Sequence, residues 1–123
     1  MNISNKWKDY ECMKTGNGEK LERWKNIILI RPDPQIIWNK TEKWNNYDAH
    51  YHRSSEGGGY WEFKKKLPEY WTVNYKDLTF KVSPTNFKHT GIFPEQSSNW
   101  DFINKKITEY RKTHDEMRVL NLF

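Results

Sequence analysis

The chain has 123 residues and a formal net charge of +5; 30% of its residues are charged and only 35% belong to the hydrophobic set. Seven Trp, seven Tyr and six Phe offset this polarity. Disordered chains are poor in aromatic residues, so the composition predicts a folded domain with a core built from rings. The single alanine, Ala49, argues against a helical bundle. A moderate positive charge permits a polyanionic partner without requiring one.

Several features bear on the compartment. Cys12 is the only cysteine, which excludes an intramolecular disulfide and fits a reducing compartment. The longest aliphatic run, Ile27–Ile30, is far shorter than the roughly 20 residues of a membrane span. Residues 1–7 lack the apolar segment of a signal peptide. We therefore expect a soluble, cytoplasmic protein with no membrane partner.

The first two-thirds of the chain indicates short strands. Asn17-Gly18 is the dipeptide that favours a primed hairpin turn. Residues 26–31 form a β-branched apolar run closed by Pro32, which favours a buried strand. Alternation in residues 60–63 predicts another strand, and Glu56–Gly59 reads as a flexible loop without the Lys-Ser/Thr ending of a phosphate-binding loop.

The clearest hairpin spans residues 71–82. With Lys76-Asp77 as the turn, three cross-strand pairs fall on one face. These pairs are Trp71 with Val82, Val73 with Phe80, and Tyr75 with Leu78. Lys-Asp is not a favoured two-residue turn, so the strands are better specified than their connection.

The clearest helix begins at Ser98, which can cap it, with Asp101 near the positive end of the helix dipole. Its apolar residues recur at helical spacing and make one stripe: Trp100, Ile103, Ile107 and Tyr110. Residues 118–123 then read as a buried type of strand. An unpaired strand is a template for association, so a homo-oligomer through residues 119–123 is expected.

Two further clusters have possible chemistry. His50 and His52 would share a face of a strand, a workable spacing for two metal ligands, but no Cys or third His lies nearby, so a surface or hydrogen-bonding role is favoured over a metal site. Basic and aromatic residues interleave over residues 43–66, where stacking on bases and contact with phosphates would suit RNA. The candidate RNA-binding residues are His52, Arg53, Lys64 and Lys65. The alternative is that the rings are core and the lysines a solvated face.

Four blocks carry a family resemblance: residues 16–24 followed by 31–35; residues 51–55 with 57–59; residues 88–96 with Asn99-Trp100; and Val119–Phe123. In this order they resemble the N-terminal part of class I S-adenosylmethionine (SAM)-dependent methyltransferases, in the branch close to bacterial large-subunit rRNA methyltransferases.

The resemblance implies an α+β fold, with a small, mostly antiparallel sheet, one long helix, and a terminal strand that begins a Rossmann-like catalytic domain. It divides the chain into a β-rich region, residues 1–96, and a linking helix with that first strand, residues 97–123. The family's glycine-rich cofactor loop and ribose-binding acid would follow Phe123. The residues that match the segment lying against the cofactor are Thr90, Gly91, Phe93, Glu95 and Gln96.

No residue matches a catalytic nucleophile or base of the family. The resemblance therefore implies a truncated methyltransferase that is inactive alone and does not bind SAM tightly. A non-catalytic basic RNA-binding module remains the alternative, and a third hypothesis is a module that pairs its free strand with another chain.

Overall fold

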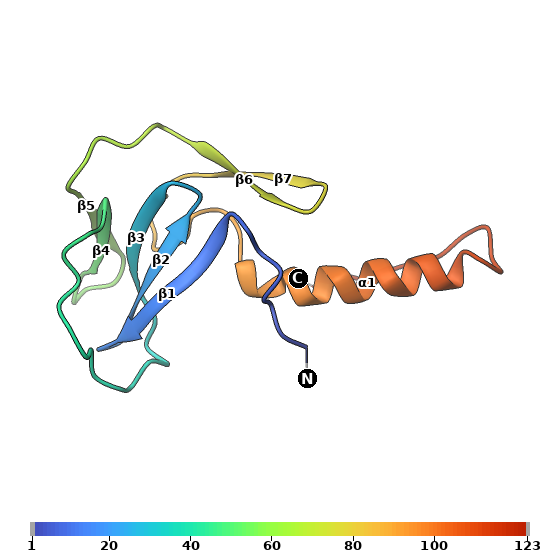
Figure 1. The fold of residues 1–123 in the computed structure, drawn as a ribbon, viewed down its shortest axis with the longest axis horizontal. Helices are drawn as coiled ribbons and strands as arrows, with labels where there is room; N and C mark the ends of the chain where they lie inside the picture. Colours follow the sequence, from blue (N-terminus) through green and yellow to red (C-terminus); the bar gives the residue numbers. More distant parts are fainter. Residues whose placement is uncertain (1, 123) are drawn as a thin grey trace. The chain divides into compact units, whose positions relative to one another are not determined.

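The computed structural model describes residues 2–122 and gives them an α+β fold (Figure 1). Residues 6–92 pack as one unit, and residues 2–5 with 93–122 as another. The seven strands of the described chain all belong to the first unit, and its α-helix belongs to the second. None of the described helical segments has the length and apolar character of a membrane span.

The first unit contains a five-stranded sheet whose strands lie side by side in chain order. They are β1 (Tyr10–Gly16), β2 (Glu19–Trp24), β3 (Ile27–Pro32), β4 (Ala49–Arg53) and β5 (Gly59–Phe63). All neighbouring pairs are antiparallel except β3 and β4, which are parallel. A separate hairpin joins β6 (Trp71–Tyr75) to β7 (Leu78–Val82). The predicted mostly antiparallel sheet is confirmed.

Backbone conformation confirms two predicted turns. Asn17 and Gly18 have φ values of 52° and 71°, and positive φ at both central residues is what a type I′ turn requires. In the β6–β7 hairpin the three predicted cross-strand pairs are present, with Lys76-Asp77 as the turn. Lys76 adopts a φ of 50°, which is unusual for a residue with a side chain. The pairing of the two strands therefore overrides the poor turn preference of this dipeptide.

The hydrophobic core lies on one face of the sheet. Trp24, Leu29 and Ala49 point to this face and form a fully buried cluster with Val73 and Val82 of the β6–β7 hairpin. Five more aromatic rings pack against the cluster: Trp7, Tyr10, Trp61, Trp71 and Phe80. Much of the core is therefore built from rings, as the composition predicts.

A buried ion pair lies on the same face. Arg31 on β3 donates from Nε to Glu22 Oε1 at 2.5 Å and from Nη2 to Glu22 Oε2 at 2.9 Å. Glu22 is 0% exposed and Arg31 is 5% exposed. Tyr10 also donates its hydroxyl to Glu22, and burial together with that carboxylate raises the pKa of Tyr10. Arg31 Nη1 donates to the Lys88 carbonyl at 3.0 Å, which fastens the segment before residue 90 to the sheet.

The second unit begins with a short 3₁₀ helix, Pro94–Gln96, which continues directly into α1 (Ser97–Tyr110). The predicted cap at Ser98 is wrong: Ser98 lies in the first turn, and Gln96 occupies the N-cap position without a side-chain cap. Pro94 starts the 3₁₀ turn earlier because its fixed φ suits a first helical position. Half of the predicted apolar stripe is exposed, since Ile103 and Tyr110 are each 42% exposed.

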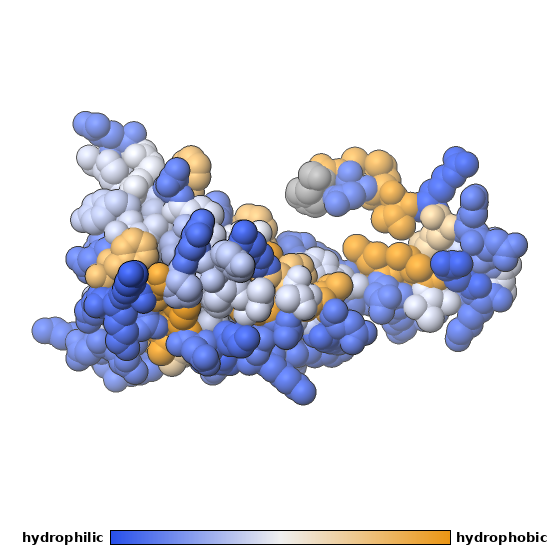
Figure 2. All heavy atoms as spheres, turned by 90° about the horizontal axis from the view of Figure 1, so that it is seen from above, coloured by the Kyte–Doolittle hydropathy of each residue, from blue (hydrophilic) through white to orange (hydrophobic). Residues whose placement is uncertain are grey.

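The predicted terminal strand is not formed. Residues 118–122 have no strand structure, and Phe123 lies outside the described residues. Within this unit the chain turns back after α1 (Figure 1), and Leu120 and Leu122 are each 82% exposed. Figure 2 shows hydrophobic side chains on the surface of this region. A strand needs a neighbour to accept its hydrogen bonds, and no other described residue of this unit supplies one.

Candidate functional site

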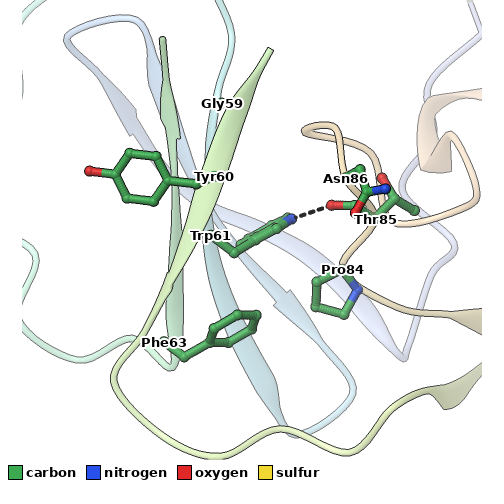
Figure 3. A pocket seen from close by; sticks show the side chains of 7 residues that line it. All are labelled: Gly59, Tyr60, Trp61, Phe63, Pro84, Thr85 and Asn86. Carbon is green, nitrogen blue, oxygen red and sulfur yellow. Dashed lines mark hydrogen bonds between the residues drawn. The ribbon is translucent and has the colours of Figure 1, made fainter.

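Strands β4 and β5 present different side chains on their two faces. The pairs Tyr51–Trp61 and Ala49–Phe63 lie on the face that carries the core. The alternate positions, His50, His52, Tyr60 and Glu62, lie on the opposite face. In Figure 3, Tyr60 points away from Trp61 and Phe63, as this alternation requires.

The core-side face of β5 borders an open pocket of about 430 Å³. The loop after β7 forms its other wall, and Trp61 Nε1 donates to the Thr85 carbonyl at 2.8 Å across it (Figure 3). The lining residues are Gly59, Tyr60, Trp61, Phe63, Pro84, Thr85 and Asn86. Tyr60 is ionisable, but its phenol points to the opposite face of the sheet, and the other lining residues have no ionisable side chain.

The opposite face gathers imidazoles and carboxylates. The rings of His50 and His52 lie with centroids 4.0 Å apart, and one possible ligand atom from each lies within 4.8 Å of the other and of a Glu62 carboxylate oxygen. Glu62 is the cross-strand partner of His50. The sequence predicts the shared face of the two histidines but not this carboxylate, because the pairing of β4 with β5 is needed to find it.

Glu19 on β2 lies beside this cluster. It contacts His50 Nε2 and accepts a hydrogen bond from Lys40 Nζ at 2.9 Å. Partial burial alone would raise the pKa of Glu19, but the hydrogen bonds from His50 and Lys40 lower it to about 2. Glu19 is therefore ionised at neutral pH.

The four candidate RNA-binding residues fall into separate groups. His52 and Arg53 are adjacent in the chain and lie on opposite faces of the sheet. Lys64 and Lys65 directly follow β5, next to the end of β4 that begins with Ala49. Arg53 lies at the other end of β4, about 13 Å away at about 3.3 Å per strand residue. The two pairs of residues therefore do not form one basic patch. Their separation matches contact with different phosphates of the same RNA molecule.

The two lysines also have partners within the chain. Lys64 Nζ donates to the Asn45 carbonyl at 3.1 Å and lies 3.8 Å from the centre of the Tyr47 ring. Lys65 Nζ lies 3.2 Å from Asp48 Oδ1. Both side chains remain exposed, so these contacts leave their charges accessible to an anion.

Arg53 belongs instead to a basic group with Lys88. Partial burial lowers the pKa of Lys88, and the positive charge of Arg53 lowers it further. Lys20 and Arg31 add to the same effect, while Asp33 opposes it. Repulsion of this kind is relieved by a bound anion. Lys88 was not among the RNA-binding residues predicted from sequence.

The predicted cofactor segment begins in the first unit. Thr90 is fully buried, its carbonyl accepts from Ser83 N at 3.0 Å, and its hydroxyl has no hydrogen-bond partner. Gly91 has a φ of +111°, a conformation that side chains rarely adopt. Together with the Arg31–Lys88 bond, these contacts hold the start of the segment in one conformation.

The rest of the predicted cofactor segment belongs to the second unit. Phe93 is 52% exposed, and Glu95 and Gln96 are also exposed, in the 3₁₀ helix that leads into α1. Gln96 Oε1 accepts from Asn99 Nδ2 at 2.8 Å, and the Glu95 carbonyl accepts from Ser4 Oγ at 2.7 Å.

This chain is similar to a protein of known structure. No protein-family model matches the sequence, and no curated protein matches it. Among solved structures, a match covers 84% of this chain with 31% sequence identity and a TM-score of 0.76. The matching protein is the SAM-dependent methyltransferase from Agrobacterium tumefaciens. This chain therefore has a methyltransferase-like fold, as the resemblance implies, and it spans 34% of that enzyme's length.

Proposed function

We propose that the chain is the N-terminal part of a class I SAM-dependent methyltransferase that acts on RNA, in the branch close to the bacterial large-subunit rRNA methyltransferases. The observation that carries the proposal is the structural match at 31% identity over 84% of the chain. The sequence blocks that resemble this family support it independently. The RNA substrate is supported by the exposed basic side chains of Arg53, Lys64 and Lys65.

The cofactor site proposed for this chain is incomplete. Thr90, Gly91, Phe93, Glu95 and Gln96 would contribute one edge of it, while the family's glycine-rich loop and ribose-binding acid have no counterpart among the residues of this chain. Methyl transfer depends on holding the sulfonium in line with its acceptor, which one edge of a pocket does not achieve. Each lost hydrogen bond weakens binding by about 0.5–1.5 kcal/mol, and about 1.4 kcal/mol is tenfold in affinity. The chain alone is therefore inactive and binds SAM in the millimolar range or worse.

Calorimetry tests this proposal. Titration of SAM into the 123-residue chain should give no saturable heat at micromolar cofactor. Addition of the region of the Agrobacterium enzyme that this chain does not match should restore binding, and Gln96→Ala should then weaken it. The matched control is Gln35→Ala, an exposed glutamine outside the segment. Micromolar binding by the chain alone would contradict the incomplete site.

A non-catalytic RNA-binding module is the second candidate, favoured by the same exposed basic side chains and by the 62% exposed ring of Tyr60. Fluorescence anisotropy with a labelled single-stranded RNA over a range of salt concentrations tests it. Arg53→Gln should weaken binding and reduce the salt slope by about one, whereas Lys105→Gln on α1 should change neither. If the chain binds RNA but the unmatched region of the Agrobacterium enzyme does not restore SAM binding, this candidate is favoured over the first.

A further inference from the structure

We propose that His50, His52 and Glu62 form a binding site for a divalent transition metal such as Zn²⁺. Among residues 2–122, these three are the group whose imidazole and carboxylate atoms converge closely enough to hold an ion. The site lies on the face of β4 and β5 opposite the hydrophobic core, whereas Arg53 lies on the core-side face.

The backbone already places the three ligands. His50 and His52 project from the same face of β4, and Glu62 projects from the paired position on β5. Ligand atoms bound tetrahedrally at about 2.0–2.2 Å from zinc lie about 3.3–3.6 Å from each other. The present atoms lie within 4.8 Å of one another, so closure needs a shift of roughly an ångström, which side-chain rotation supplies. Glu62 is 53% exposed in its side chain and is free to make most of this movement.

An unsatisfied polar atom points independently to a ligand. His52 Nε2 is buried and has no hydrogen-bond partner, and the nearest Glu62 oxygen lies 3.7 Å away, beyond hydrogen-bond distance. A buried polar atom without a partner costs free energy, so such atoms are uncommon in folded proteins. A metal ion between His52 and Glu62 would satisfy this nitrogen and the carboxylate together.

The surroundings fit a bound cation. His52 is held by ring contacts on both sides, with His50 at 4.0 Å and Tyr60 at 5.2 Å between centroids. Glu19 contacts His50 Nε2 and places a second carboxylate beside the site, and Lys40 Nζ donates to this carboxylate at 2.9 Å. Two imidazoles and one carboxylate are a ligand set that suits zinc and related divalent metals.

The position of the site defines what the metal would do. Two ligands come from β4 and one from β5, so the ion would join the two strands on either side of the connection formed by residues 54–58. We assign it a structural role that holds this hairpin, without a role in methyl transfer.

Zinc titration tests the site. The tag-free chain carrying Cys12→Ser, which removes the exposed thiol as a competing ligand, is titrated with ZnCl₂ in a calorimeter, and with CoCl₂ while the visible absorption of bound cobalt is recorded. One ion should bind per chain. His52→Ala and Glu62→Gln should each weaken zinc binding at least tenfold, while His114→Ala and Glu69→Gln, which alter the same residue types elsewhere, should not.

Circular dichroism separates a lost ligand from a lost fold. Glu62→Gln changes an exposed side chain and should leave the spectrum unchanged, so it remains informative if His52→Ala unfolds. Absence of saturable binding below about 100 μM zinc, or binding unaffected by Glu62→Gln and by any folded His52 variant, would overturn the proposal.

Discussion

Arg31→Met is the substitution that most directly probes how the sheet is held together. Methionine keeps an unbranched chain of similar reach but removes the charge, so the carboxyl group of Glu22, which is 0% exposed, would lose both hydrogen bonds from Arg31. The substitution also removes the hydrogen bond to the Lys88 carbonyl, which fastens the start of the proposed cofactor segment. The damage should therefore reach both the core and that segment.

The expected cost is large. Removing one partner of a buried ion pair destabilises a protein by about 3–5 kcal/mol, against about 5–15 kcal/mol for a whole domain. With a urea m value of about 2 kcal/mol/M, the unfolding midpoint should fall by about 1.5–2.5 M. Replacing both charges, Glu22→Leu with Arg31→Met, should recover much of the loss because no uncompensated charge remains.

Urea unfolding followed by tryptophan fluorescence measures both effects. The control is Glu11→Gln, which removes an exposed partner of Arg23 at 3.6 Å and should cost less than about 1 kcal/mol. The assignment of a tightly coupled pair would be refuted if Arg31→Met lowered the free energy of unfolding by less than about 1 kcal/mol. It would also be refuted if the double variant were no more stable than Arg31→Met alone.

Three further predictions concern other parts of the chain. Gly59→Ala should lower the free energy of unfolding by about 1–3 kcal/mol, because its Cβ would meet the His52 carbonyl and lie 2.8 Å from the Tyr51 ring. Gly58→Ala meets no atom and should cost less despite its φ of +71°, and equal costs in urea unfolding would contradict this contrast. Arg53→Gln should raise the pKa of Lys88 in an NMR titration; since the folded-state pKa is lowered, stability should rise with pH just below the ordinary lysine value, and less so in the variant. Deleting residues 119–123 should reduce self-association in light scattering, because Leu120 and Leu122 are 82% exposed; a monodisperse full-length monomer at high concentration would count against this.

Local chemistry explains what the sequence predicts well. Asn17-Gly18 defines its turn because both positions adopt positive φ, and no distant contact is needed to recognise that preference. The β6–β7 hairpin is predictable for a similar reason: alternation places Trp71, Val73 and Tyr75 opposite their partners once the turn is located. Both features depend on a turn whose position the sequence itself indicates.

Features that depend on a strand register that the sequence does not define are not predicted, even where the two strands are neighbours in the chain. Glu62 joins the two histidines because β5 pairs with β4, and Glu22 meets Arg31 because β2 pairs with β3 in a particular register. The prediction of a strand at residues 118–122 is wrong because the strand-like pattern is present there but a neighbouring strand is not. A strand-like apolar pattern describes which side chains favour burial, but a strand forms only where a neighbouring backbone completes its hydrogen bonds.

The proposal that this chain forms one part of an RNA methyltransferase is tested most directly by methyl transfer from radiolabelled SAM to large-subunit rRNA. The chain is assayed alone, together with the unmatched region of the Agrobacterium enzyme, and beside that region alone. The account predicts incorporation of label only when both parts are present. Incorporation of label by the 123-residue chain alone would contradict the proposal. So would a mixture of both parts that forms a complex and binds SAM but incorporates no label.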